Sequence, residues 1–412
     1  MIMPVLASVL SAVLFASALF CFIRALPARW RQDRLPGNVS VFSARELGFV
    51  LLLCLGCLVL RMAAVSAARL LGGKNTALAD TFRMYSGLDS KHYFEIAKNG
   101  YRTAEFGEYL NLVFFPGYPL LTGLFMLALP EMISGYLAAW LPFLAAGMAL
   151  YRLFRLEEEP PAARRMLLWL CLFPGAVFYA YPMSESLYLA AAAAALYLAR
   201  TRRWLAAGVC GFLAAFTRSL GALLVLPLGV ELLEQFLPLR RENRKDFLRC
   251  GACLLLIPLA VLIYLWINRI TAGDPLIFLQ YQKSNWHQAT GWFFQTAATQ
   301  TEYALSTWTE APVKFWGLWL PNLLVGFVSL LLMVYACAKR LLRVPEAAWF
   351  FVYFAVSYGA TWLLSGPRYM AVFWPLAVVT EKLPLPKWSK AALLGSAALA
   401  YTVFFALRWS VW

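Results

Sequence analysis

Residues 2–26 read IMPVLASVLSAVLFASALFCFIRAL, an apolar run long enough to cross a bilayer as one helix of about 20 residues. Similar runs recur along the 412 residues, of which 62% are hydrophobic and 14% are charged. The runs are rich in Leu, Ala and Phe, and they do not alternate with period two as the strands of a membrane barrel do. Because backbone polar groups in hydrocarbon must be satisfied within each segment, the sequence predicts an all-α polytopic membrane protein.

The number and spacing of the runs predict about 11–13 transmembrane or re-entrant helices in a single integral membrane domain over residues 1–412. The first run lacks a basic start and a small-residue cleavage site, so we interpret it as a retained helix rather than a signal peptide. Two CxxC pairs, Cys54/Cys57 and Cys250/Cys253, have no polar ligand beside them. We interpret them as small buried thiols and expect neither a disulfide nor a structural metal.

The net charge of +15 does not indicate nucleic-acid binding, because the basic residues form short clusters between apolar runs. The positive-inside rule explains such clusters as cytoplasmic turns, here at residues 24–34, 152–165, 200–203, 240–249 and 339–343. Counting crossings between them places two polar connections, at about residues 72–111 and 269–312, on the outer side. Around residues 112–165 the number of predicted crossings does not agree with these sides of the membrane, because two apolar runs lie where an odd number of crossings is needed. Either the run at 112–130 is re-entrant, or the cluster at 152–165 is not cytoplasmic.

The two outer connections hold both histidines of the chain and three of its five aspartates: Asp80, Asp89, His92, Asp274 and His287. Such a concentration of titratable residues on one side favours a functional site there. In the first connection, LDSKHYFEIAKNGY at residues 88–101 has the pattern of an amphipathic helix lying at the interface. Asp89 stands at its start and is either an N-cap or a reactive carboxylate. Asp274 is as well explained by a turn.

Two charged residues interrupt apolar runs. Arg218 separates runs at about residues 203–217 and 219–236, which predicts the outer end of a helical hairpin. It is either a site residue, a snorkelling arginine or the partner of a carboxylate. Glu185, within YPMSESLYLA, needs an arginine partner or a water-filled cleft, because an unpaired charge is costly in hydrocarbon.

Five elements follow one another over about residues 80–380. They are the Asp89, His92, Tyr93, Gly100 and Tyr101 segment with Asn111 and FFPGYP at 114–119; FPGAVFYAYPMSESLY at 173–188; FTRSLG at 216–221; GDPLIFLQYQKSNW at 273–286; and SGPRYMAVFWP at 365–375. In this order they resemble the glycosylphosphatidylinositol mannosyltransferase 2 (PIG-V) family and its bacterial relatives, which are GT-C-type glycosyltransferases. Leu88 and Ser219-Leu220 depart from the family pattern, which usually has Trp and a polar residue there.

The resemblance implies a GT-C-type fold and an enzyme that passes a hexose, typically mannose, with inversion from a polyprenyl phosphate to an acceptor hydroxyl. Such a reaction needs a base and positive charge at the leaving phosphate. The implied base is Asp89, and the implied phosphate-binding residues are Arg218, Arg368, His92 and Lys91. The implied positioning or acceptor-binding residues are Glu185, Tyr93, Trp286, His287 and Tyr369. The alternative for Arg368 is an interfacial snorkelling residue, and the functional interpretation is favoured over it.

The expected partners are the polyprenyl phosphate hexose, membrane lipids and a glycan, lipid or protein acceptor, without nucleic acid. Carboxylates and histidines show no metal-site spacing, so no obligatory metal or other cofactor is expected. A bacterial cytoplasmic membrane is favoured over the endoplasmic reticulum, with the site facing away from the cytoplasm. Two alternatives stay open: a non-enzymatic transporter or flippase of lipid-linked sugars, and a structural subunit of a membrane complex.

Overall fold

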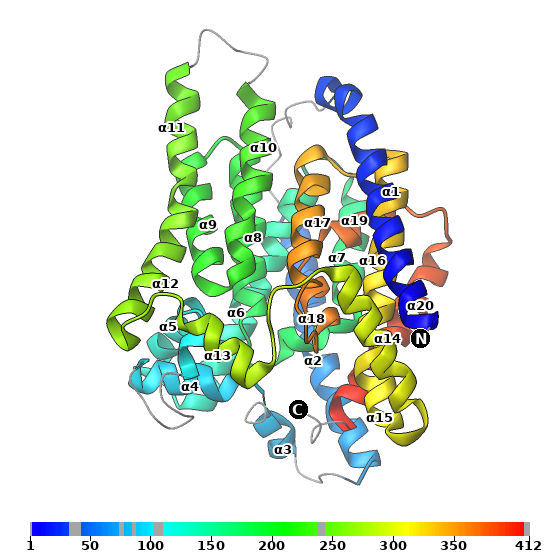
Figure 1. Cartoon of the computed structure of the whole chain (residues 1–412). Helices are drawn as coiled ribbons and strands as arrows, with labels where there is room; N and C mark the ends of the chain where they lie inside the picture. Colours follow the sequence, from blue (N-terminus) through cyan, green and yellow to red (C-terminus); the bar gives the residue numbers. More distant parts are fainter. Residues whose placement is uncertain are drawn as a thin grey trace.

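The computed structural model describes residues 2–32, 43–73, 78–84, 88–101, 110–236 and 244–407, which are helical almost throughout (Figure 1). The first helices are α1 (Ile2–Gln32), α2 (Ala44–Leu71), α3 (Leu78–Arg83), α4 (Ser90–Asn99), η2 (Leu110–Val113), α5 (Gly117–Met126), α6 (Glu131–Phe154) and α7 (Pro160–Cys171). The next are η3 (Pro174–Ala180), α8 (Glu185–Arg200), α9 (Trp204–Thr217), η4 (Ser219–Leu224), α10 (Val225–Phe236), α11 (Arg244–Leu254) and α12 (Leu256–Ala272). The last are α13 (Ile277–Trp286), α14 (Phe293–Glu310), α15 (Pro312–Lys314), η6 (Phe315–Trp319), α16 (Leu320–Lys339), α17 (Val344–Ser357), α18 (Gly366–Ala371), α19 (Pro375–Glu381) and α20 (Lys387–Leu407).

The prediction of an all-α membrane protein is confirmed. In the described part of the chain, seven stretches are long and apolar enough to cross a membrane: Ile2–Pro27, Ala44–Leu71, Glu131–Phe154, Ser219–Phe236, Arg244–Ala272, Pro312–Lys339 and Lys387–Leu407. The pair α7 and η3, bent by 82°, raises the number to eight if it is one broken span. Other predicted apolar segments are shorter, such as α9 and α17 with 14 residues each. The chain is an integral membrane protein.

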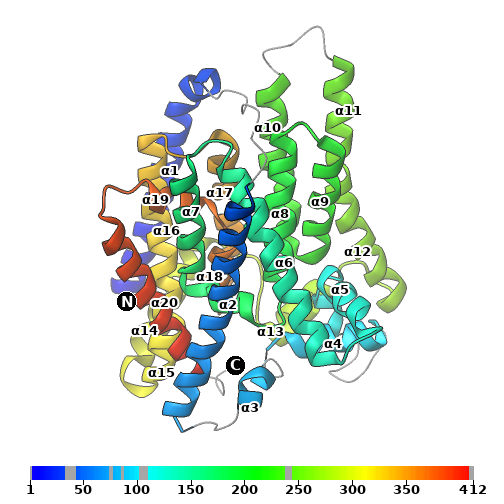
Figure 2. The same cartoon turned by 180° about the vertical axis from the view of Figure 1, so that it is seen from behind.

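Helix α5 explains why the count of crossings did not close around residues 112–165. It has only 10 residues, and it packs against α4 and α6 (Figures 1 and 2). One full-length span, α6, therefore separates the first polar connection from the basic cluster at residues 152–165. Of that connection, the structure describes α3, α4 and η2, while residues 74–77, 85–87 and 102–109 lie outside the described ranges.

The helices gather polar groups at two opposite ends of the molecule. At the end where α10 and α11 project, Arg200 of α8 pairs with Glu157, Glu231 and Glu346 (Figure 1). Arg343 joins the same group through Glu157, Glu231 and Glu234. These pairs link the ends of α6, α8, α10 and α17. The basic clusters at 152–165, 200–203 and 339–343 thus lie at one end, as the positive-inside rule requires if that end is cytoplasmic.

The opposite end holds α4, α5 and α13, which lie close together in both views (Figures 1 and 2). Next to them, α8 packs between α6 and α9, and α9 packs against α12. Helices α8 and α9 have 16 and 14 residues, far fewer than the 28 of α2. Their shortness leaves room for a polar cavity at this end.

Candidate active site

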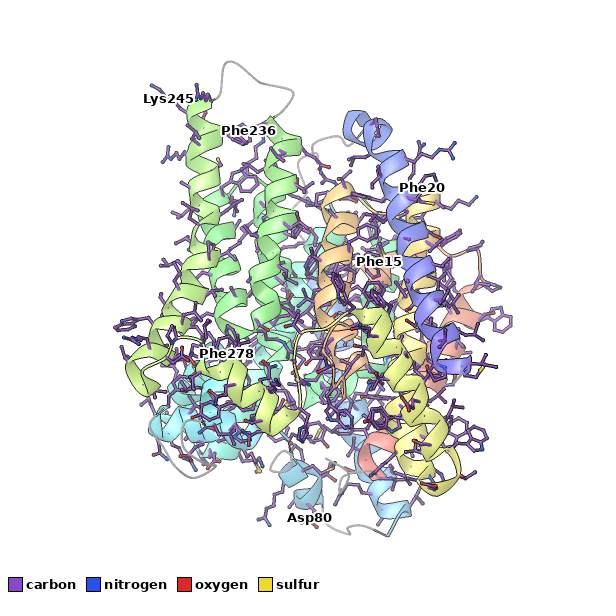
Figure 3. All side chains as sticks on the ribbon, in the orientation of Figure 1. Phe15, Phe20, Asp80, Phe236, Lys245 and Phe278 are labelled. Atoms are coloured by element: carbon purple, nitrogen blue, oxygen red, sulfur yellow. The ribbon has the colours of Figure 1, made fainter. Side chains whose placement is uncertain are left out.

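A cavity of about 200 Å³ lies at the end of the molecule that holds α4 and α13. One of the residues that line it is Phe278 of α13, which is labelled in Figure 3. The cavity is lined by side chains that come from all five sequence elements: Asp89, Tyr93, Val113, Phe114, Phe115, Ser184, Thr217, Arg218, Ser219, Leu220, Phe278, Gln282, Trp286, Gln288, Leu364, Ser365, Arg368 and Tyr369. The lining is polar around the charged groups and apolar around Phe115, Phe278 and Leu364. The fold therefore brings segments up to 280 positions apart, Asp89 and Tyr369, into one site.

Arg218 reaches the cavity because the chain breaks between two helices at this residue. Helix α9 ends at Thr217, and Arg218 is extended, with φ −150° and ψ 145°. The 3-10 turn η4 then folds back so closely that a Cβ on Gly221 would lie 2.3 Å from the backbone of Ala214. Glycine is required for this close approach. The predicted break in the hairpin at Arg218 is thus present.

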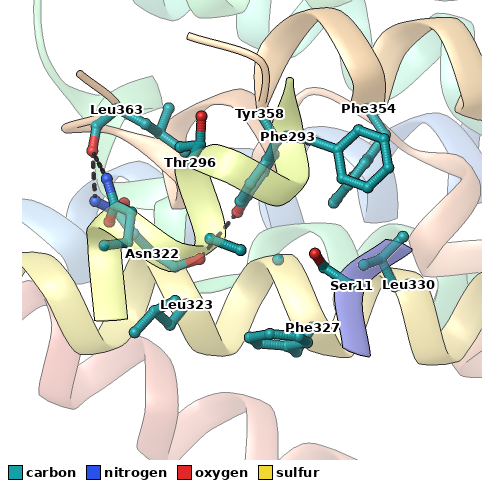
Figure 4. Close-up of a pocket in the computed structure, with 13 residues that line it drawn as sticks. Ser11, Phe293, Thr296, Asn322, Leu323, Phe327, Leu330, Phe354, Tyr358 and Leu363 are labelled. Carbon is teal, nitrogen blue, oxygen red and sulfur yellow. Dashed lines mark hydrogen bonds between the residues drawn. The ribbon is translucent and has the colours of Figure 1, made fainter. Parts of the chain in front are cut away.

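Arg368 sits on the short helix α18, which is fixed by its neighbours. The Asn322 amide of α16 donates to the Leu363 carbonyl at 3.0 Å (Figure 4). The Gly366 N–H donates to Asn322 Oδ1 at 2.8 Å. These bonds lie beside a small apolar cavity of about 20 Å³. The Tyr353 hydroxyl donates to the Tyr369 carbonyl at 2.6 Å. The segment that carries Arg368 is therefore held on both sides.

We expect Gly175→Ala to displace Arg368 and to destabilise the fold. A Cβ on Gly175 would lie 2.0 Å from the Pro367 carbonyl oxygen, one residue before Arg368, and backbone cannot rotate away as a side chain can. Such overpacking costs about 1–3 kcal/mol. A lower midpoint of thermal unfolding in detergent checks this. Gly229→Ala is the matched control, because nothing lies within 4 Å of its Cβ position; equal stability of the two variants would contradict the argument.

Four charged side chains form a continuous chain of ion pairs in the order Asp89, Arg368, Glu185, Arg218. We call it the charge chain. Arg368 Nη1 lies 2.6 Å from Asp89 Oδ2, and Arg368 Nε donates to Glu185 Oε1. Arg218 Nη1 donates to the same Glu185 oxygen. Glu185 is fully buried, whereas the Asp89 side chain is 23% exposed. The carboxylate that is open to a ligand is therefore Asp89, and Glu185 holds both guanidinium groups from behind.

The charge chain decides between the alternative interpretations of these residues. Asp89 occupies the N-cap position of α4, but its side chain makes no capping hydrogen bond and reaches Arg368 instead. Arg368 is buried, so it is not a snorkelling residue. Arg218 has a carboxylate partner and also lines the cavity. By contrast, Asp274 Oδ1 accepts from the Leu276 N–H at 2.9 Å, which is the turn suggested for it.

Ser184 connects Tyr93 to Arg218. The Tyr93 hydroxyl lies 3.1 Å from Ser184 Oγ, which also accepts a hydrogen bond from Arg218 Nη1 at 3.1 Å. Burial raises the pKa of Tyr93 to about 12, so its phenol stays protonated at neutral pH. The Arg218 guanidinium also lies 5.6 Å from the centre of the Tyr369 ring, a cation–π distance. Tyr93 and Tyr369 thus both adjoin Arg218.

Four of the predicted site residues do not line the cavity: Glu185, which lies behind the two arginines, and His92, Lys91 and His287. The His92 ring is buried, stacks on Phe114 at 4.7 Å and contacts Asn111 Oδ1 through Nδ1 at 2.9 Å. Burial lowers the pKa of His92, which favours the neutral ring at pH 7. Lys91 is exposed beside it. His287 is exposed, with a positive φ of 54°, and its ring lies 6.5 Å from that of Trp362. Trp286, in contrast, lines the cavity.

The structure adds residues that the sequence did not single out. Ser184 and Gln288 line the cavity, and Gln282 does so from an element where no role was assigned to it. Asn322, which supports the Arg368 segment, is a lone amide in the apolar run of α16. Polar residues inside a membrane helix mark structural or functional contacts, so Asn322 carried a readable signal. Among the described residues, no three His, Cys, Asp or Glu side chains are placed to hold a metal ion.

Comparison with solved structures finds chains that are similar to this one, and one of them is ArnT. No family model matches the chain, and no curated protein matches it. The crystal structure of ArnT from Cupriavidus metallidurans bound to undecaprenyl phosphate is similar, with 16% sequence identity and a TM-score of 0.49. The similarity covers 85% of this chain and 63% of ArnT, so the chain spans less than two thirds of the length of that protein.

Proposed function

We propose that the chain is an inverting glycosyltransferase that moves a hexose from a polyprenyl phosphate to an acceptor hydroxyl. Mannose is the sugar that the resemblance to the PIG-V family implies. The observation that carries the proposal is the charge chain, which puts the partly exposed carboxylate of Asp89, the buried Arg368 and the largely buried Arg218 at a single cavity. An inverting transfer needs a base for the acceptor proton and positive charge for the leaving phosphate.

Each residue of the charge chain has a defined part in this reaction. The Asp89 carboxylate takes the proton of the acceptor hydroxyl as its oxygen attacks the anomeric carbon of the sugar. The bond from that carbon to the phosphate oxygen breaks on the opposite face, and its electron pair leaves with the polyprenyl phosphate. Arg218 and Arg368 stabilise the charge of this phosphate. Glu185 is a positioning residue, because it binds both guanidinium groups and does not line the cavity.

The two arginines keep hydrogen-bond donors for a phosphate. Arg218 contacts Glu185 and Ser184 through Nη1, and Arg368 contacts Glu185 and Asp89 through Nε and Nη1. A guanidinium has five N–H donors, and the Nη2 group of each arginine has no hydrogen-bond partner among the residues that the structure describes. The apolar side chains of the lining suit the first isoprene units of the lipid. The polyprenyl phosphate hexose is therefore the ligand that fits both the arginines and the apolar lining of this cavity.

We place the site on the extracytoplasmic side, opposite the basic clusters, in one domain whose outer connections cover about residues 72–111 and 269–312. A bacterial cytoplasmic membrane is the proposed location. The acceptor is a hydroxyl of a glycan, lipid or protein. The charge of the two arginines takes the part that a metal ion would have at the phosphate, so the proposed reaction has no obligatory metal.

The proposal is tested with purified protein in nanodiscs, incubated with polyprenyl phosphate mannose and a panel of acceptors. We expect release of polyprenyl phosphate and a product whose anomeric configuration is opposite to that of the donor. Retained configuration would exclude an inverting mechanism. Passage of the lipid-linked sugar across liposomes, with no release of polyprenyl phosphate, would instead support a transporter.

A further inference from the structure

One face of α13 forms a wall of the cavity. Phe278, Gln282 and Trp286 recur every four residues along this helix, so they share a face, and all three line the cavity. The ring of Phe278 packs on Tyr264 at 5.2 Å, and that of Trp286 packs on Phe114 at 5.6 Å. The wall is thus anchored by an aromatic contact at each end. Gln282 is left between them as the polar group of this wall.

The amide of Gln282 has a direction that the backbone determines. Gln288 Nε2 lies 3.0 Å from the Trp362 carbonyl oxygen, which can only accept, so the NH₂ group of Gln288 points there. The Gln288 amide oxygen is then left to accept from Gln282 Nε2, at 3.1 Å. The Gln282 NH₂ group is consequently engaged. Its oxygen Oε1 is an acceptor with no donor among the residues that the structure describes.

The hydrogen bonds from Gln282 to Gln288 and from Gln288 to the Trp362 carbonyl are supported by fixed backbone. Gly291 N–H donates to the Gly359 carbonyl at 2.7 Å, and Thr361 N–H donates to the Ala289 carbonyl at 3.0 Å. These two bonds join the segment after α13 to the segment before α18. Gln288 and its acceptor carbonyl therefore keep their relative positions, which is the requirement for a preorganised binding group.

An acceptor oxygen in the cavity selects the ligand group that can lie against it. A phosphate diester is anionic and has no proton to donate, so it is repelled by a carbonyl oxygen and attracted by Arg218 and Arg368. A hydroxyl of the sugar or of the acceptor carries an O–H that can donate a hydrogen bond to Gln282 Oε1. The cavity is thereby divided into an anion-binding part at the arginines and a hydroxyl-binding part at α13.

We propose that Gln282 is a specificity-determining residue whose Oε1 accepts a hydrogen bond from a hydroxyl of the bound substrate. That hydroxyl belongs either to the transferred sugar or to the acceptor. The identity of the substrate rests on the function proposed above, whereas the orientation of the amide does not. Gln288 is the positioning residue that holds the Gln282 amide in this orientation.

The test compares Gln282→Met with Gln280→Met, the same change on an exposed position of the same helix that does not line the cavity. Dissociation constants are measured in nanodiscs for polyprenyl phosphate mannose and for polyprenyl phosphate. A lost neutral hydrogen bond corresponds to roughly a 3- to 10-fold change. We expect Gln282→Met to weaken binding of the mannosyl lipid by this factor and to leave polyprenyl phosphate unchanged, which assigns the hydroxyl to the sugar.

The other arm of the experiment measures the KM for the acceptor. If both lipids bind Gln282→Met as they bind the wild type, and the acceptor KM rises 3- to 10-fold, the hydroxyl belongs to the acceptor. Three results overturn the proposal: no change in any constant, equal weakening of both lipids, or the same loss in Gln280→Met. The binding constants need no turnover. With an inactive wild type the proposed function is removed, selective weakening of the mannosyl lipid in Gln282→Met still supports the role of Gln282, and unchanged binding of both lipids overturns it.

Discussion

Asp89→Asn is expected to lower the turnover of polyprenyl phosphate mannose about 10²- to 10⁴-fold, the range that general base catalysis contributes. The amide keeps the shape of the carboxylate but cannot take the acceptor proton. Asp89 is also the most exposed member of the charge chain, with 23% of its side chain accessible, so its replacement disturbs the fold least. Release of polyprenyl phosphate by wild type and variant, measured side by side in nanodiscs, checks this.

Asp274→Asn serves as the control, because it makes the same substitution in the second outer connection. Asp274 Oδ1 accepts from a backbone N–H in a turn, which an amide oxygen also does. Its turnover should equal that of the wild type. Full activity of Asp89→Asn would exclude Asp89 as the base. Removing Glu185 is a poorer probe, since breaking a buried pair costs about 3–5 kcal/mol and threatens the fold.

The second prediction concerns the affinity for polyprenyl phosphate. Arg368→Gln is expected to weaken binding of this lipid about 10- to 100-fold, the range for a charge-assisted hydrogen bond. Asp89→Asn is expected to do the opposite and strengthen it about 10-fold, because Asp89 competes with the phosphate for Arg368 Nη1 at 2.6 Å. Loss of transfer and gain of binding should thus coincide in the same variant. Titration of the lipid into nanodisc-embedded protein measures both.

A double-mutant cycle distinguishes this competition from simple repulsion between Asp89 and the phosphate. In an Arg368→Gln background the gain from Asp89→Asn should vanish, because there is no shared guanidinium left to release. In an Arg218→Gln background it should persist, since no direct contact joins Asp89 to Arg218 among the pairs of the charge chain. A gain that survives in both backgrounds would contradict the competition. Arg218 still pairs with Glu185 when Arg368 is replaced, so the buried carboxylate keeps a partner.

The general plan of the fold was predictable because apolar length and basic clusters are physical signals of membrane crossing. They located α2, α6 and α16, and they placed the polar connections at one end. Segments that are too short to cross, such as α5, carry a similar apolar composition, so hydropathy alone counted them as spans. Pro174 and Gly175 indicate that a helix ends before η3, but the angle of 82° between α7 and η3 follows only from the assembled fold.

Which residues form the site was predictable in part, because helical spacing determines which side chains share a face. Asp89, at the N-cap of α4, and Tyr93 are four positions apart and both line the cavity, while Lys91 and His92 lie between them and do not line it. If the orientation of Asp89 had been known, helical spacing would have separated Asp89 and Tyr93 from the two residues between them. The pairing of Asp89 with Arg368 joins residues 279 positions apart, and such a contact follows only from the assembled fold.

The shortness of α8 and α9 has a consequence for the surrounding lipid. A helix of 14 residues is about 21 Å long, whereas the hydrocarbon of a bilayer is about 30 Å thick. In the proposed orientation, we therefore expect the charged groups at the end of α9 to lie below the headgroups of the outer leaflet. The proposed lipid-linked sugar would then reach these groups without leaving its leaflet, more easily than a water-soluble sugar phosphate. On this proposal, bilayer thickness helps to determine which substrates reach Arg218.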